Sequence, residues 1–436
     1  MLPPGPSEPP LLQTARWVLR PIAFMEAGRR RYGEAFSVRF LGFTTPMVMV
    51  SSPEAIRALY ADREHRLPPG RGIALRPVIG ERSLLLLEGV EHLARRRLML
   101  PPFHGERMRA YEATVRDLAE REVAGWPGDR PFAVHPRMQA LTLEVIMRAV
   151  FGVTDAGRRA RVRDLLRRLL DGTASTTLQF RVLAARRRPD ADPLAHLRRT
   201  AREIDALLLA EIAERRADPR AGEREDILSL LLAARFEDGA GMDDRELRDQ
   251  LVTLLMAGHE TTATALAWTV DLLVRHPAAL ARLTAEADRG AGPWVRAVIR
   301  EALRLRPVVA LAGRRLAAEL RVDGLRLPAG TDVTPAIWLT HTRADLYPEP
   351  YAFRPERFLE RPPATYAWIP FGGGVRRCLG AAFAELEMRV VLETIVRRRA
   401  LRPAAARAER VTRRNVTFSP RHGPRVLAPP RRAAYI

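Results

Sequence analysis

The chain has 436 residues and a formal net charge of +21, and all 72 of its basic residues are arginine. This length allows a large buried core in one to three domains. A strongly basic chain can bind nucleic acid, but these arginines are dispersed and do not alternate with aromatic residues that could stack on bases. We therefore expect no nucleic-acid partner, and interpret the charge as arginine spread over all surfaces.

The N-terminal residues 1–10 form a proline-rich tail without the apolar run of a signal peptide. The longest apolar stretch, 251–274, carries His259, Glu260 and Asp271, which is typical of a buried helix and not of a membrane span. We expect a soluble, cytoplasmic protein with no membrane span.

Hydrophobic periodicity predicts the main elements. Short β-like runs at 36–39 and 47–50 predict paired strands, and a further β-like run is expected at 320–327. Long helical patterns dominate the rest, above all 192–216 and 244–275. The predicted fold class is mainly α with small β-sheets.

Two charged segments have helical spacing. His92 and Arg96 are four residues apart and therefore share one helix face, shortly before Pro101. Glu301 and Arg304 are three apart, and Arg357 follows in Pro-Glu-Arg-Phe. An i,i+3 ion pair is weak evidence in so arginine-rich a chain. The order of these segments along the chain resembles that of a known family, named below, and this resemblance implies a largely buried structural network. Removing one partner of such a network would cost about 3–5 kcal/mol.

Inside the 244–275 helix lies the sequence Ala257-Gly258-His259-Glu260-Thr261-Thr262. A hydroxyl beside a titratable carboxyl suits proton transfer, and the small residues before them leave room for a ligand. Two structural readings remain open: a helical threonine can bond to the carbonyl four residues earlier and bend the helix, and Glu260 can lie on a solvated face.

Cys378 is the only cysteine, so neither an intrachain disulfide nor a multi-cysteine zinc site can form. It lies in Phe371-Gly-Gly-Gly374-Val-Arg376-Arg-Cys378-Leu-Gly380, ahead of a predicted helix over 379–397. The N-terminus of a helix stabilises an anion, so this cysteine should persist as a thiolate. A buried cysteine after a glycine turn is the structural alternative.

The spacing Phe-x-x-Gly-x-Arg-x-Cys-x-Gly, preceded in order by the Glu-Thr and Glu-x-x-Arg segments, resembles the cytochrome P450 superfamily, the haem-thiolate monooxygenases of the soluble bacterial type. The resemblance covers about 11–426. It implies the cytochrome P450 fold, with 1–436 as a single haem-binding domain behind the N-terminal tail.

The resemblance also implies residue roles. Cys378 would be the metal ligand of haem b, iron protoporphyrin IX, with Phe371 packed beside the sulfur. Gly374 would permit the turn and Gly380 would let the backbone approach the macrocycle. Arg376 would reach a haem propionate.

More distant residues would complete the site. His92, Arg96 and Arg314 match propionate-binding positions, although many relatives carry tryptophan in place of His92, and Arg315 leaves the choice of arginine open. Thr261 matches the threonine, and Glu260 the acid, that deliver protons during oxygen activation, so these two are the expected catalytic residues.

The implied function is a monooxygenase that activates O2 to hydroxylate or otherwise oxidise a lipophilic small molecule. Electrons would come from ferredoxin and ferredoxin reductase, or from flavodoxin, and a monomer is expected. Apolar segments match the positions that line the substrate cavity in relatives: Met256, Ile73–Leu75, Val308–Leu311 and Val416–Phe418.

Two other functions remain open. The same fold could run peroxide-driven oxidation or oxidative coupling, against which the intact Glu260–Thr261 pair argues mildly. A non-catalytic haem-binding sensor is the alternative from a different class.

Overall fold

The structure, a computed structural model, describes residues 2–41, 43, 45–61, 76–152, 156–174, 194–290, 292–414 and 416–431. It divides into two compact units. One comprises Met1–Gly70, Val115–Leu141 and Thr261–Ile436, and the other Arg71–Thr114 and Thr142–Glu260. Each unit is described by itself. Ile73–Leu75 lie outside the described residues.

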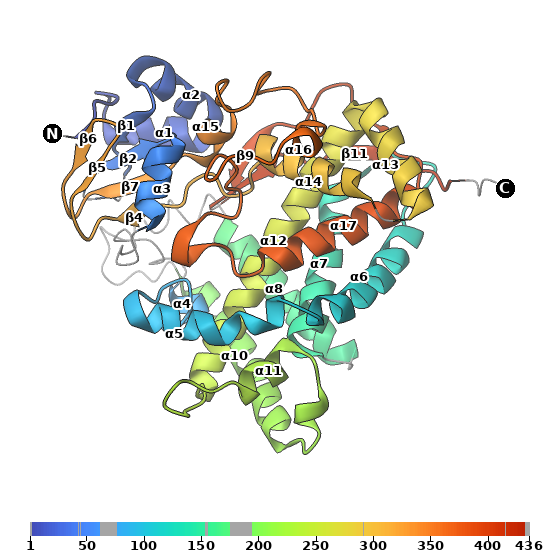
Figure 1. Cartoon of the computed structure of the whole chain (residues 1–436). Coiled ribbons are helices and arrows are strands. Elements are labelled where there is room, and N and C mark those ends of the chain that lie inside the picture. Colours follow the sequence, from blue (N-terminus) through green and yellow to red (C-terminus); the bar gives the residue numbers. More distant parts are fainter. Residues whose placement is uncertain are drawn as a thin grey trace. The chain divides into compact units, whose positions relative to one another are not determined.

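The first unit contains every strand of the described residues. Its largest sheet has the order β1-β2-β7-β4, from β1 (Ala35–Val38), β2 (Met47–Val50), β7 (Asp332–Pro335) and β4 (Arg314–Arg315) (Figure 1). β1 and β2 are antiparallel, with Ala35 opposite Val50, whereas β7 runs parallel to β2. The predicted pairing of 36–39 with 47–50 is confirmed within one residue.

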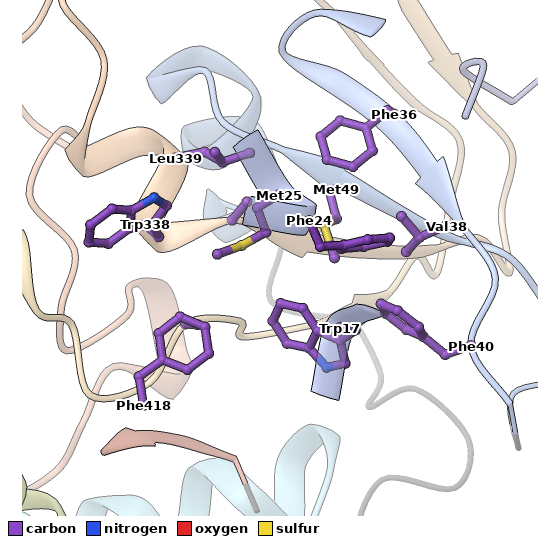
Figure 2. Packing of buried hydrophobic residues seen from close by; sticks show 12 residues of the cluster. Trp17, Phe24, Met25, Phe36, Val38, Phe40, Met49, Trp338, Leu339 and Phe418 are labelled. Carbon is purple, nitrogen blue, oxygen red and sulfur yellow. The ribbon is translucent and has the colours of Figure 1, made fainter. Parts of the chain in front are cut away.

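An aromatic core packs against this sheet. Trp17 lies 5.7 Å from Phe40 and 5.9 Å from Phe418, measured between ring centroids, so helix α1 and the C-terminal strands share one cluster. Figure 2 shows these rings together with Phe24 and Trp338. Such clusters supply most of the apolar burial that stabilises a unit of this size.

The other sheets are small. The β-like run expected at 320–327 is a hairpin of two strands, β5 (Leu320–Val322) and β6 (Leu325–Leu327). Asp323 and Gly324, with φ of 51° and 72°, make the two-residue turn that such hairpins require. β9 (Val411–Arg414) pairs with β10 (Thr417–Pro420), and β11 (Arg425–Leu427) lies between β3 (Phe132–Ala133) and β8 (Arg402–Pro403).

Several helices of the first unit begin at proline, whose fixed φ suits the first helical turn; they include α13 and α14. The helices of this unit are α1 (Pro10–Leu19), α2 (Pro21–Tyr32), α3 (Pro53–Ala61), α13 (Pro277–Arg289), α14 (Pro293–Leu305), α15 (Ile337–His341), α16 (Arg357–Glu360) and α17 (Ala381–Arg398), with the 3-10 turn η3 (Gly374–Arg376).

The second unit has helices and loops but no strand among its described residues. Its own helices are α4 (Arg76–Ile79), α5 (Gly89–Met99), η1 (Pro101–Phe103), α8 (Ala156–Ala174), α10 (Ala195–Ala217), η2 (Ala221–Glu223) and α11 (Ile227–Ala233). Three long helices belong to both units, namely α6 (Arg107–Ala124), α7 (Val134–Phe151) and α12 (Asp244–Arg275).

Sequence periodicity located the long helices well. The expected helix over 244–275 is confirmed as α12. The expected helix over 379–397 starts later, at Ala381, because Leu379 and Gly380 still belong to the turn that follows Cys378. No helix among the described residues is long and apolar enough to cross a membrane.

Candidate active site around Cys378

Cys378 lies on a tight loop just before α17, and its side chain is exposed. Its backbone N–H donates to the carbonyl of Phe371 at 2.9 Å, which closes the loop on itself. Gly372 and Gly374 have φ of 67° and 62°, a conformation that only glycine adopts without strain. Gly374 therefore adopts the positive φ that the predicted turn requires, and Cys378 occupies an exposed position of the loop.

Tyr60 on α3 supports this loop from one side. A Cβ on Gly373 would come within 2.5 Å of the Tyr60 ring, and one on Gly374 within 2.5 Å of the Tyr60 carbonyl oxygen. Gly373 is thus required for close packing, and Gly374 is required both for close packing and for the turn. Gly380 differs, because a Cβ there would meet no described atom within 4 Å beyond its chain neighbours.

The other side of the loop is anchored to α14. The indole N–H of Trp368 donates to the carbonyl of Arg300 at 3.1 Å, and its ring lies edge-on to half-buried Phe371, 6.0 Å between centroids. Because both Tyr60 and Trp368 hold the loop, the position of Cys378 is fixed by packing and not by the loop alone.

Behind the loop lies the expected charge network. Glu301 and Arg304 are fully buried and joined at 2.6 Å, and Arg357 reaches Glu301 at 3.2 Å. Arg304 also donates to the carbonyls of His341 and Pro350 at 2.8 and 2.7 Å. The prediction of a buried structural network is confirmed, and its cations also satisfy carbonyls of an irregular segment.

His341 links this network to the cysteine loop. Its Nδ1 donates to the carbonyl of Arg304 at 3.2 Å, and its Nε2 accepts from the N–H of Ile369 at 2.9 Å. This arrangement requires the neutral imidazole. Burial, with the Arg304 charge as a lesser cause, lowers the pKa of His341 to about 3.

Arg314 and Arg315 have different surroundings. Arg315 pairs with Asp332 at 2.8 Å. Arg314 is buried, stacks 5.6 Å from the centroid of the Tyr60 ring, and donates only to the carbonyls of Ala312 and Gly313 among the described residues. Burial lowers the pKa of Arg314. A buried guanidinium without a described acid beside the cysteine loop is suited to an anionic ligand.

Away from its two ends, the long helix α12 has one accessible stretch. From Glu246 to Val274 its residues are buried, except for Met256, Ala257, Gly258, Glu260 and Thr261. Two of these are small, and the last two are the expected acid and alcohol. His259, between Gly258 and Glu260, is buried, and this burial lowers its pKa to about 4.

His92 and Arg96 lie on α5 in the second unit, whereas the cysteine loop belongs to the first. His92 is buried and Arg96 is partly exposed. The arginines on either side of Arg96 bind acids, Arg95 pairing with Glu246 at 2.7 Å and Arg97 with Glu237 at 2.8 Å. The roles expected of His92 and Arg96 stay predictions.

The proposed substrate segments are partly brought together. The N–H of Phe418 donates to the carbonyl of Val308 at 2.7 Å, and Val309 pairs with Thr417. Segments 308–311 and 416–418 therefore lie side by side in the first unit.

The residues around Cys378 fit a bound haem. The fitting features are an exposed thiol on a rigid turn, an open position above Gly380, and a buried arginine without a described acid. Tyr60, Trp368 and His341 were missed by sequence reasoning. Only their tertiary contacts identify them, because no spacing in the sequence relates them to Cys378.

Comparison with known proteins agrees with this geometry. The cytochrome P450 family model matches residues 3–419. Cytochrome P450 135B1 of Mycobacterium bovis is 43% identical over 98% of this chain and 91% of its own length, and cytochrome P450 137 of Mycobacterium tuberculosis is 39% identical over 99% and 92%.

Solved structures agree in fold. A cyanobacterial CYP120A1 with bound retinoic acid has a TM-score of 0.83 at 24% identity, covering 99% of both chains. The haem domain of cytochrome P450DA has a TM-score of 0.85 at 23% identity, covering 99% of this chain and 98% of its own. The chain therefore belongs to the cytochrome P450 family and is an oxidoreductase of the monooxygenase type.

Proposed function

We propose that this cytochrome P450 hydroxylates or otherwise oxidises a lipophilic small molecule in the cytoplasm, with electrons from separate redox proteins. The observation that carries the proposal is the presentation of Cys378, an exposed thiol on a loop fixed by Tyr60 and Trp368. When bound, haem supplies the oxygen-activating redox chemistry, which a thiolate ligand promotes.

We assign haem b as the cofactor. Covalent attachment of a c-type haem uses two cysteines in a Cys-x-x-Cys-His motif, and this chain has one cysteine in total. Cys378 would therefore serve only as the iron ligand. Phe371 would shield the sulfur from water, and the turn at Gly374 and the small Gly380 would let the macrocycle approach.

Four cationic or polar side chains would hold the two haem propionates. Arg314 and Arg376 belong to the unit that contains Cys378, and His92 and Arg96 belong to α5. Arg314 has the strongest structural support, because propionate would give its buried guanidinium the acid that it lacks among the described residues.

Glu260 and Thr261 would transfer protons from solvent toward the haem. They lie on the accessible stretch of an otherwise buried helix, where a carboxyl can take protons from solvent and a hydroxyl can pass them on. Buried His259 stays neutral at physiological pH, so Glu260 is the titratable group of this stretch that is suited to proton exchange.

A lipophilic substrate is supported by the apolar pair of segments 308–311 and 416–418 and by Met256. For electron delivery, Arg296, Arg300 and Arg377 gather around Glu385 next to the cysteine loop. Such a cationic surface would attract an acidic ferredoxin, supplied by its reductase, or a flavodoxin.

The first test is optical. Purified protein, reduced and exposed to carbon monoxide, should absorb at the long wavelength typical of thiolate ligation, and Cys378→Ser should lose this band while Arg315→Gln keeps it. A parent protein with full haem loading that never shows the band would refute the ligand assignment.

The second test concerns activity. Titration with lipophilic compounds should shift the Soret band, and the binders should be oxidised in the presence of ferredoxin, its reductase and O2. Turnover only with hydrogen peroxide would favour the peroxide-driven alternative. Binding without any turnover would favour a haem sensor.

A further inference from the structure

Helices α7 and α12 are joined by two buried hydrogen bonds that bracket Glu260 and Thr261. The hydroxyl of Thr142 on α7 donates to the backbone carbonyl of His259 at 3.0 Å. Two turns earlier on α7, the Nε2 of His135 lies 3.2 Å from the hydroxyl of Thr264. The first contact lies within the second unit and the other within the first.

All four side chains are removed from water. Thr142 and Thr264 have no exposed surface, and His135 and His259 are 4% and 5% exposed. A hydrogen bond in such surroundings is stronger and more directional than one at the surface. The contacts are therefore built into the packing of the two helices.

The Thr142 contact acts on the helix backbone itself. In an α-helix the carbonyl of residue 259 accepts the N–H of residue 263, and its second lone pair is open to another donor. A hydroxyl that donates there tilts the carbonyl and sets the local bend of the helix. The two residues directly after this carbonyl are Glu260 and Thr261.

The ordinary behaviour of threonine in this helix provides a contrast. Thr253 and Thr269 on α12 each donate to the carbonyl four residues earlier on their own helix, at 2.6 and 2.8 Å, and the Thr253 hydroxyl also lies 2.6 Å from the Ser83 hydroxyl in the loop after α4. Those bonds satisfy a buried hydroxyl but do not connect two helices. Thr142 donates to a different helix, at the residue before the acid–alcohol pair.

We infer that Thr142 is a positioning residue for proton delivery, holding the His259 carbonyl so that Glu260 and Thr261 keep a productive orientation, with His135 and Thr264 as the second fixed point. This inference rests on the roles proposed above for Glu260 and Thr261. Thr142 itself is not assigned any contact with substrate or cofactor.

The test compares Thr142→Val with Thr142→Ser in the haem-loaded protein. Valine removes the donor at nearly constant volume, and serine keeps it. With ferredoxin, its reductase and a substrate found by titration, we expect Thr142→Val to lower product formed per NADH consumed by roughly fivefold, with hydrogen peroxide released in its place. Thr142→Ser should stay within about twofold of the parent.

Two further readouts separate positioning from damage. Turnover driven by added hydrogen peroxide, which already carries the needed protons, should fall much less than turnover driven by O2. Hydrogen exchange of the amides of residues 258–264, measured without substrate or electrons, should become roughly fivefold faster in Thr142→Val.

Thr269→Val is the matched control, because it deletes an equally buried hydroxyl on α12 that binds no other helix in the described part of the chain. Unchanged coupling and exchange in Thr142→Val, or equal losses in Thr269→Val, would overturn the inference. Should the valine variant fail to fold, Thr142→Ala against Thr142→Ser gives the same comparison.

A failure of the roles proposed for Glu260 and Thr261 can be distinguished from a failure of the inference about Thr142. If Thr261→Ala retains full coupling, the assignment of the acid–alcohol pair is wrong whatever Thr142 does. If Thr261→Ala loses coupling and Thr142→Val does not, only the inference about Thr142 is wrong.

Discussion

Arg314 and Arg315 are chemically identical neighbours with opposite surroundings. Arg314→Gln removes a buried cation that has no described acid, so it should weaken haem retention while the haem-free protein loses little stability or gains some. Arg315→Gln removes the cation that pairs with buried Asp332, so it should lower the stability of the fold but leave haem retention unchanged. The rate at which each variant loses haem to apomyoglobin measures haem retention. Equal rates of haem loss for Arg314→Gln and Arg315→Gln would contradict the assignment of Arg314.

Glu387 on α17 is a buried carboxyl whose Oε1 has no hydrogen-bond partner among the described residues. Burial raises its pKa well above the usual value. Folding then takes up a proton above about pH 4.5, so the free energy of unfolding falls with rising pH by about 1.4 kcal/mol per unit until the folded pKa is reached.

Glu387→Gln should remove this slope and stabilise the protein at pH 8, as measured by urea unfolding. Glu393→Gln on the same helix is the contrast. It should destabilise the protein, because Glu393 is buried and binds Arg389 at 3.4 Å. A Glu387→Gln variant with the parental pH dependence would show that this carboxyl is not protonated on folding.

At the scale of elements, the glycines of the cysteine loop should separate folding from cofactor binding. Gly373→Ala would force the Tyr60 ring or the loop to move, so both thermal stability and thiolate ligation should suffer. Gly380→Ala meets no described atom of the chain, so the haem-free protein should melt as the parent does while haem occupancy falls. Melting curves with and without haem measure the thermal stability of each variant. The ratio of haem absorbance to protein absorbance measures its haem occupancy.

The sequence predicted the elements that carry strong local signals. The range of α12 and the pairing of β1 with β2 follow from periodicity, and the turn at Gly374 follows from glycine chemistry. The start of α17 was placed two residues early, because the backbone bond from Cys378 to Phe371 prolongs the turn and no periodic pattern reports it.

Long-range contacts were beyond the reach of sequence. The resemblance favoured Arg314 but left Arg315 open, and only the fold shows that Asp332 lies beside Arg315. The packing of Gly373 likewise depends on Tyr60, which is far away along the chain. The Glu301–Arg304 pair was predicted, but the carbonyls that it satisfies could be identified only in the fold.

At the scale of the whole molecule, two buried histidines should make stability sensitive to acid. The pKa values of His259 and His341 are lowered to about 4 and about 3, against 6.5 when unfolded. The contribution of these two neutral histidines to the free energy of unfolding is complete above pH 6.5. It is lost as the pH falls toward 4, at about 2.7 kcal/mol per pH unit for the two together.

Unfolding by urea between pH 7 and 4 measures this slope. His259→Leu should remove about half of this slope, because the other half belongs to His341. A parental slope in His259→Leu would show that this imidazole can be protonated in the folded state.

The net charge of +21 should also influence electron transfer. Reduction by an acidic ferredoxin should slow as ionic strength rises, and Arg377→Gln should lower the low-salt rate by roughly threefold. Exposed Arg20, directly after α1, is the control and should have little effect. A rate that is independent of salt would exclude steering by the arginines near the cysteine loop.

Because Cys378 is the sole sulfhydryl and its side chain is exposed, the protein carries its own reporter at the proposed iron ligand. A maleimide dye could attach at this one position alone, and a bound metal would shield it. The speed of dye uptake would then follow departure of the prosthetic group in real time, without any engineered label.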